Sequence, residues 1–402
     1  MLPSGLYRIC LQRICELLKE GTWKTYSTNP FWLHKSPFSD LPTEIVDDLM
    51  KFAQSHFENL CIADVLLLLT SGRLTRLDLS PFDLQKECDI FQKVMRSKGF
   101  QSLRFIARCS NKSDSLSLIN TLICNCQNLE VMDVKCVDRH IISSALENCL
   151  KLTSVLYSDS LDALETIKKN RRYGISIPTL KIYGHIRLLT CVWGRDDFRN
   201  QGFQKPDSRS SKLKFLQKVR NAVSLCPFVE NLHIFVLCRE SIIELKELKR
   251  LTVLNIDLRY CDGVFLPDFA ELLRIIGPQL KELTVICKIS LPVDIICCSC
   301  PNLQALKIYG KVTASNFAKT NGSLLLEYIY IFFMDKNAVL FLLPNCKRLA
   351  FFKVCSAEGL DDNLLDRIMK INPLSYLKYV EMTRSYLSKN GFRRLLKQEV
   401  SL

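Results

Sequence analysis

CPNLQALKI, residues 300–308, is the stretch that decides the fold, because its pattern of apolar residues recurs along the chain. Leu303, Leu306 and Ile308 stand three, six and eight places after the cysteine. Residues two apart point to the same side of a β-strand, so Leu306 and Ile308 predict a strand with one buried face. The same pattern follows four other anchor cysteines, Cys126, Cys149, Cys226 and Cys346.

Upstream of each anchor the apolar period changes from that of a strand to that of a helix. Ile119, Leu122 and Ile123 precede Cys126 by seven, four and three places, which marks one face of a helix. Other residues take the anchor position at Ser71, Phe100, Leu248, Gly277, Ser323 and Leu374. From residue 226 onward the anchors follow one another at intervals of 22 to 29 residues.

A period in the twenties that joins a strand to a helix is typical of leucine-rich repeats. The pattern therefore predicts an α/β leucine-rich-repeat solenoid with one parallel sheet on its concave face and helices on its convex face. The chain resembles the cysteine-containing leucine-rich repeats of ubiquitin-ligase receptors. Strands are expected at about residues 76–80, 131–135, 231–235, 253–257, 282–286, 305–309, 328–332, 351–355 and 379–383.

The repeats divide the chain into two expected parts. Residues 1–60 do not fit the repeat and form a helical segment, and residues 61–402 form the solenoid. Between Cys149 and Cys226 only fragments of the pattern remain, such as PTLKI at 178–182. The polar, basic stretch near 194–214 is interpreted as an inserted loop.

Composition limits the compartment and the partners. We interpret many of the 19 cysteines, such as Cys124, Cys126, Cys149, Cys297 and Cys298, as reduced, buried thiols. With no signal peptide and no apolar run long enough to span a membrane, we expect a cytoplasmic or nuclear protein that does not bind membranes. The net charge of +14 would suit an acidic protein surface or nucleic acid, or reflect a solvated convex face. We expect an acidic protein target and no nucleic acid.

No catalytic motif is present in the sequence. It contains no phosphate-binding glycine loop, no HExxH and no GxSxG. Cys297 and Cys300 form a CxxC without a second cysteine pair at metal spacing. We expect a non-catalytic protein with no metal and no cofactor.

The N-terminal segment carries two short motifs. Leu6, Cys10 and Ile14 lie four residues apart on one helical face, and this spacing looks like the BC-box that docks on elongin C. The later stretch DLPTEIVDDLM is similar to a cullin-2 box, with expected contacts at Leu41, Pro42, Ile45 and Leu49. The layout resembles the leucine-rich-repeat receptors of cullin-2–elongin ubiquitin ligases, such as the Zyg family.

That resemblance implies a substrate-recognition subunit that binds elongin C, elongin B and cullin-2 and holds a target protein on its repeats. Two alternatives stay open. The first sixty residues could form a helical cap on a scaffold without ligase activity, because a solenoid needs a polar terminal cover. They could also form an F-box, whose opening likewise reads LPxEI.

A candidate target surface comes from the strand pattern toward the C-terminus. Residues five, seven and nine places after an anchor alternate with the buried ones and should point out of the sheet. Aromatic rings on an exposed patch are common anchors of interfaces, and lysines beside them favour an acidic or phosphorylated partner. The alternative is that other parts of the chain cover the rings. The expected target-binding residues are Lys307, Tyr309, Tyr328, Tyr330, Phe332, Phe351, Lys353 and Tyr379.

Overall fold

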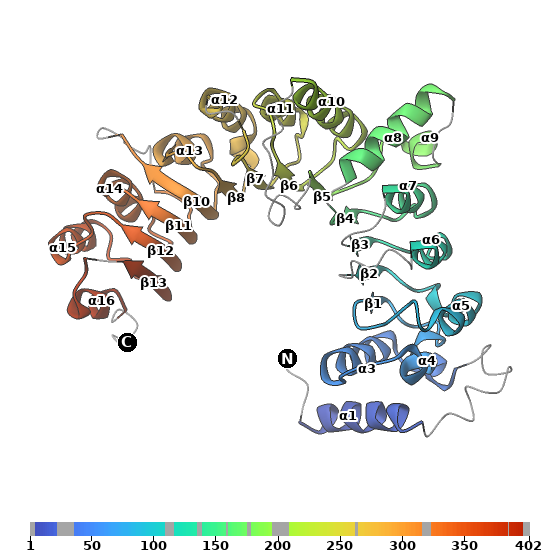
Figure 1. Cartoon of the computed structure of the whole chain (residues 1–402). Helices are drawn as coiled ribbons and strands as arrows, with labels where there is room; N and C mark the ends of the chain where they lie inside the picture. Colours follow the sequence, from blue (N-terminus) through green and yellow to red (C-terminus); the bar gives the residue numbers. More distant parts are fainter. Residues whose placement is uncertain are drawn as a thin grey trace. The chain divides into compact units, whose positions relative to one another are not determined.

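The fold was analysed in a computed structural model that describes residues 5–21, 36–108, 116–134, 139–157, 160–174, 178–194, 209–261, 264–315, 323–384 and 386–396. The chain divides into two compact units, Met1–Cys191 and Val192–Leu402. In each unit strands and helices alternate along the sequence, and the helices lie on one side of the strands (Figure 1). This is the α/β leucine-rich-repeat architecture that the repeat predicts.

The first unit begins with two longer helices and continues with short repeats. Its helices are α1 (Gly5–Lys19), η2 (Pro37–Asp40), α3 (Thr43–His56), η3 (Ile62–Val65), α4 (Leu66–Leu69), α5 (Cys88–Arg96), η4 (Lys98–Phe100), α6 (Leu116–Asn125), α7 (Arg139–Asn148), α8 (Ser160–Arg172) and α9 (Pro178–Tyr183). Its strands are β1 (Arg76–Asp78), β2 (Phe105–Arg108), β3 (Val131–Val134), β4 (Ser154–Val155) and β5 (Thr190–Trp193), which reaches two residues past the division. Neighbouring strands pair in parallel and in chain order.

The second unit has longer strands. Its strands are β6 (Asn231–Phe235), β7 (Val253–Asp257), β8 (Glu282–Ile286), β9 (Leu291–Pro292), β10 (Ala305–Thr313), β11 (Tyr328–Met334), β12 (Phe351–Ala357) and β13 (Tyr379–Arg384). Its helices are α10 (Arg209–Leu225), α11 (Glu240–Glu244), η7 (Leu245–Glu247), α12 (Leu266–Ile276), η8 (Gly277–Gln279), α13 (Val293–Ser299), α14 (Lys336–Asn345), α15 (Asp362–Ile371) and α16 (Lys389–Leu396). All these strands pair in parallel, and β9 adds to one end of β10.

The anchor positions form the turns between helix and strand. In the repeat at Cys300, the N–H of Leu303 donates to the Cys300 carbonyl at 3.2 Å, which closes the turn before β10. Leu303, Leu306 and Ile308 are all buried. At Gly277 the turn packs so closely that an added Cβ would lie 2.2 Å from the backbone oxygen of Ser299. At this anchor the absence of a side chain thus lets neighbouring repeats approach.

Side chains beside the anchors link each repeat to the one before it. The Cys149 thiol donates to the Cys126 carbonyl at 3.4 Å, and its burial raises the pKa of that thiol to about 12. Asn302 donates to the carbonyl of Pro278 at 2.7 Å. Further bonds of this kind run from Ser102 to Gly72, Asn128 to Gln101, Gln279 to Leu248 and Asn372 to Leu343. In every pair the donor belongs to the later repeat.

Three expectations about the chain need correction. Residues 209–214 of the expected insert belong to α10, and residues 195–208 lie outside the described part. PTLKI is helical, within α9, and the strand of that repeat is β5. Cys124 and Cys298 are exposed, because they fall on the outer faces of their helices. Cys126, Cys149 and Cys297 are buried as expected, and the cysteines in the described residues are all free thiols.

No helix in the described residues combines the length and the apolar character needed to cross a membrane.

Candidate binding surfaces

Helix α1 buries one apolar side and exposes another. Leu11, Cys15 and Leu18 are buried, and the Cys15 thiol donates to the carbonyl of Leu49 on α3 at 3.5 Å. The Tyr7 hydroxyl adds a hydrogen bond to the Asp48 carboxylate at 2.8 Å. These contacts fix α1 against α3 and thereby determine which side of α1 faces outward.

The outward side of α1 contains the motif residues. Leu6 is 71% exposed, Ile9 is 63% exposed, and Cys10 is also exposed. Ile14 lies at the border between the two sides and is half-buried. A helix that is apolar on both sides has more apolar surface than α3 covers, and the uncovered part contains Leu6 and Cys10.

The residues expected to contact a cullin are placed at the start of α3. Pro42 is exposed, and Leu41 and Ile45 are half-buried, so these three are accessible to a partner. Leu49 is 0% exposed, which contradicts the expectation that it contacts a cullin. It lies one helical turn beyond Ile45 on the side of α3 that packs into the unit, so it is a core residue.

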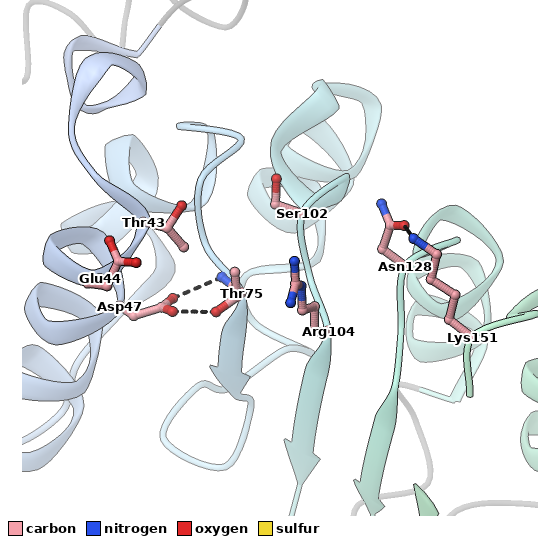
Figure 2. Close-up of a pocket in the computed structure, with 8 residues that line it drawn as sticks. All are labelled: Thr43, Glu44, Asp47, Thr75, Ser102, Arg104, Asn128 and Lys151. Carbon is pink, nitrogen blue, oxygen red and sulfur yellow. Dashed lines mark hydrogen bonds between the residues drawn. The ribbon is translucent and has the colours of Figure 1, made fainter. Parts of the chain in front are cut away.

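A polar pocket of about 610 Å³ lies beside α3 in the first unit (Figure 2). It is lined by Thr43, Glu44, Asp47, Thr75, Ser102, Arg104, Asn128 and Lys151. The Asp47 carboxylate accepts from the backbone N–H of Thr75 at 2.8 Å and also from the Thr75 hydroxyl. Lys151 donates to the Asn128 amide oxygen at 2.7 Å. These bonds engage groups that could otherwise hold a ligand, so we interpret the pocket as the joint between α3 and the first repeats.

In the second unit, the outward residues of β10–β13 form a surface that we call the aromatic face, made of three rows across the strands together with Tyr309 and Phe332. Strand register defines the first row as Ala305, Tyr328, Phe351 and Tyr379. It defines the second as Lys307, Tyr330, Lys353 and Glu381. It defines the third as Lys311, Phe333, Ser356 and Arg384.

The rings of the aromatic face stack on one another. Tyr328 and Phe351 have ring centroids 4.2 Å apart with planes 5° from parallel, and Phe351 and Tyr379 are 4.4 Å apart at 4°. Tyr309 lies 5.0 Å from Tyr330 at 44°. Tyr309, Phe332 and Tyr379 are 40–42% exposed, and Tyr328, Tyr330 and Phe351 are half-buried. The rings are therefore partly exposed and lie on the surface of the described part of the chain.

Two lysines and one glutamate set the charge among these rings. The Lys353 ammonium lies 2.8 Å from the Glu381 carboxylate, and their hydrogen bond raises the lysine pKa and lowers the glutamate pKa. Both side chains therefore stay charged at neutral pH. The Lys307 ammonium lies 5.0 Å from the centre of the Tyr328 ring, within the range of a cation–π contact. Desolvation raises the pKa of Tyr328 and of Tyr330, so both phenols keep their protons.

The third row contains residues that the strand period does not predict. The register between β10 and β11 shifts after Ile308. The next pair after Ile308 with Ile331 is Lys311 with Phe333. Phe332 and Phe333 both become exposed, at 40% and 42%, with rings 5.1 Å apart. A strict alternation of inward and outward residues places Phe333 inside. The sequence signal is the pair Phe332-Phe333 before Met334. Met334 lies one residue later than the place where strict alternation from Ile331 puts the next buried side chain.

Metal-binding side chains do not gather in the described parts of the chain, where no three His, Cys, Asp or Glu side chains are placed to bind a metal ion. Cys297 and Cys300 of the CxxC are both buried, and desolvation raises the pKa of the Cys300 thiol to about 12. These thiols are core residues.

Comparison with protein-family models and with curated proteins gives no match. Among solved structures, this chain is similar to a chain of the crystal structure of the Rad7 and Elc1 complex in yeast. The two chains are 12% identical in sequence. The likeness covers 97% of this chain and 96% of that chain, with a TM-score of 0.46. A likeness at this score carries no argument about function.

Proposed function

We propose that the protein is a non-catalytic substrate-recognition subunit of a cullin–elongin ubiquitin ligase, acting in the cytoplasm or nucleus. Helix α1 binds elongin C with elongin B, the start of α3 selects cullin-2, and the repeats hold the target protein. The aromatic face is the part of the repeats that we assign to the target.

The observation that carries the proposal is the exposed side of α1. Leu6 and Cys10 occupy the positions that the BC-box spacing requires, and both are accessible while the opposite side of the helix packs on α3. A helix held by one side can place an apolar side chain in a groove of a partner without unfolding its own unit. Burial of Leu6 in such a groove would remove a large exposed apolar side chain from water.

The cullin assignment depends on fewer residues than the elongin assignment. Leu41, Pro42 and Ile45 remain as candidate contacts, and Leu49 is left out because it is buried. Pro42 and Ile45 lie one turn apart at the start of α3, so one partner surface can contact both. We expect Pro42→Ala with Ile45→Ala to release cullin-2 while elongin binding persists.

The decisive experiment compares capture of purified elongin B–elongin C by the intact protein and by two single variants. Leu6→Ala removes the proposed anchor. Ile371→Ala is a matched control, because Ile371 is 67% exposed at the end of α15 in the other unit. Loss of capture by the Leu6 variant alone supports the proposal. Equal capture by all three proteins contradicts it.

A scaffold without ligase activity is the second candidate function. The packing of Leu11, Cys15 and Leu18 on α3 favours it, because α1 then covers the end of the repeats as a cap. A scaffold would bind neither elongin C nor cullin-2 even when intact. An F-box-type receptor would also fail to bind elongin C and would instead bind a different ligase adaptor through α3.

A further inference from the structure

The stacking on the aromatic face determines what a partner meets there. Tyr328, Phe351 and Tyr379 are nearly parallel, so the flat faces of neighbouring rings contact one another. Between the stacked rings only edges remain accessible, together with the hydroxyl group of Tyr328, because the Tyr379 hydroxyl donates to the Glu381 carboxylate at 2.5 Å. The edge of an aromatic ring is electropositive and its face electronegative. The first row therefore presents weak positive charge, which suits oxygen atoms of a partner better than cationic groups.

The formal charges on the same face sum to a positive value, because lysines and an arginine outnumber the one glutamate. Lys307, Lys311 and Arg384 occupy outward positions, and none of them has an ion-pair partner among the residues that the structure describes. Lys353 is neutralised by Glu381 at 2.8 Å, which leaves three uncompensated cations. Lys311 and Arg384 are exposed at the two ends of the third row, with Phe333 between them.

The rows run across the strands, so a ligand that follows one row contacts four repeats in turn. Register pairs place Lys311, Phe333, Ser356 and Arg384 side by side on β10, β11, β12 and β13. Neighbouring strands in a sheet are about 4.8 Å apart, and an extended chain advances about 3.3 Å per residue. A segment of only a few residues can therefore reach from one end of the row to the other.

We propose that the target feature held by the aromatic face is an extended acidic protein segment, rich in aspartate and glutamate, that lies across β10–β13. Its carboxylates pair with Lys307, Lys311 and Arg384, and its apolar side chains lie against Phe333 and the ring edges of the first row. This inference rests on the target-binding role proposed above, and it adds the chemistry of the ligand.

The experiment selects binders from a random peptide library displayed on phage, using the full-length protein as bait. We expect Asp and Glu to be enriched in the selected peptides and Lys and Arg to be depleted. A representative selected peptide should bind several-fold more weakly when salt is raised, because exposed charge pairs are screened. Selection of basic or uncharged peptides by the aromatic face would overturn the inference.

A charge reversal tests whether the lysines recognise the acidic peptide. Lys307→Glu with Lys311→Glu should weaken its binding at least about tenfold, because carboxylates would then face carboxylates. Lys347→Glu with Lys370→Glu is the matched control, since both lysines are exposed and lie in a turn and on α15, away from the outward strand positions. The control should bind as the unmodified protein does. Equal weakening in both variants would show a general charge effect and overturn the proposed contacts.

The outcomes separate this inference from the role on which it rests. If peptides are selected without an acidic preference and their binding requires Tyr330 and Phe351, the face captures targets but the acidic assignment is wrong. If no peptide is selected and the face captures only a single-stranded oligonucleotide, both the acidic segment and the protein target are wrong. Elongin capture through α1 is measured on a different surface and is unaffected by either result.

Discussion

Replacement of Leu6 by alanine separates the docking role of α1 from its structural role. Leu6 is 71% exposed in the isolated chain, so a partner can bury most of its side chain. Complete burial of a leucine side chain contributes about 1.5–3 kcal/mol, and 71% of that is roughly 1–2 kcal/mol. A loss of this size raises the Kd for elongin B–elongin C by about six- to thirty-fold. Isothermal titration calorimetry with purified components measures it directly.

Leu11→Ala gives the opposite pattern on the same helix. Leu11 is 7% exposed and packs on the unit, so its truncation should lower the free energy of unfolding by about 2 kcal/mol or more. Leu6→Ala should leave the free energy of unfolding unchanged within about 0.5 kcal/mol, as is usual for exposed positions. An unchanged Kd for the Leu6 variant, with the fold intact, refutes the assignment of the box.

Three further predictions concern stability. Tyr330→Ala with Phe351→Ala should abolish target capture but shift the melting temperature by only a few degrees, because both rings are partly exposed. Unfolding of this double variant in a calorimetric scan would instead show that the rings belong to the core. Asp47→Ala should destabilise the first unit by about 1–3 kcal/mol in urea titration, because a backbone N–H loses its acceptor; an unchanged midpoint would contradict this. The buried thiols of Cys149 and Cys300 have pKa values raised from 9.0 to about 12. Their protonated forms therefore stabilise the folded protein fully below pH 9, and this stabilisation is lost as pH rises toward 12. Urea midpoints that stay constant across this range would contradict the prediction.

Most of the second unit could be predicted from the apolar pattern. The bounds of β6, β7 and β8 agree with the expected 231–235, 253–257 and 282–286. The agreement has a physical cause: the helix period ends and the strand period begins at the anchor, which forms the turn between them. Each repeat contacts its neighbours, so a local pattern repeated along the chain also specifies the tertiary structure.

The parts that escaped prediction depend on departures from that period. The register shift after Ile308 places one more residue on β10 than on β11 between successive pairs. Only the pairing of the two strands reveals that Phe333 faces outward. β5 follows the same spacing, with Leu188, Cys191 and Trp193 three, six and eight places after His185, but a histidine at the anchor and the short helix α9 before it hide the repeat. Leu49 shows a different limit, because an apolar residue on a helix has the same signature whether a partner or the core covers it.

The accessible positions of the candidate sites were predicted better than their chemistry. Alternation along β11 and β12 correctly placed Tyr328, Tyr330 and Phe351 on the outward side. Their stacking depends on the register between strands, which sequence spacing alone does not give. The same register determines that Lys353 neutralises Glu381 while Lys307 stays without a carboxylate partner among the described residues.

The side-chain hydrogen bonds from Ser102, Asn128, Gln279, Asn302 and Asn372 to the repeat before each of them run toward the N-terminus. Asn128 reaches the carbonyl of Gln101, and Asn302 reaches the carbonyl of Pro278. A chain leaves the ribosome with its N-terminal end first, so within each unit the acceptor of such a bond is made before its donor. Each of these side-chain bonds can therefore form as soon as the later repeat emerges, whereas a bond such as that from the Leu79 N–H to the Ala107 carbonyl closes only when the next strand has been made. The side chains of the turns are thus suited to fasten each repeat in the order of translation.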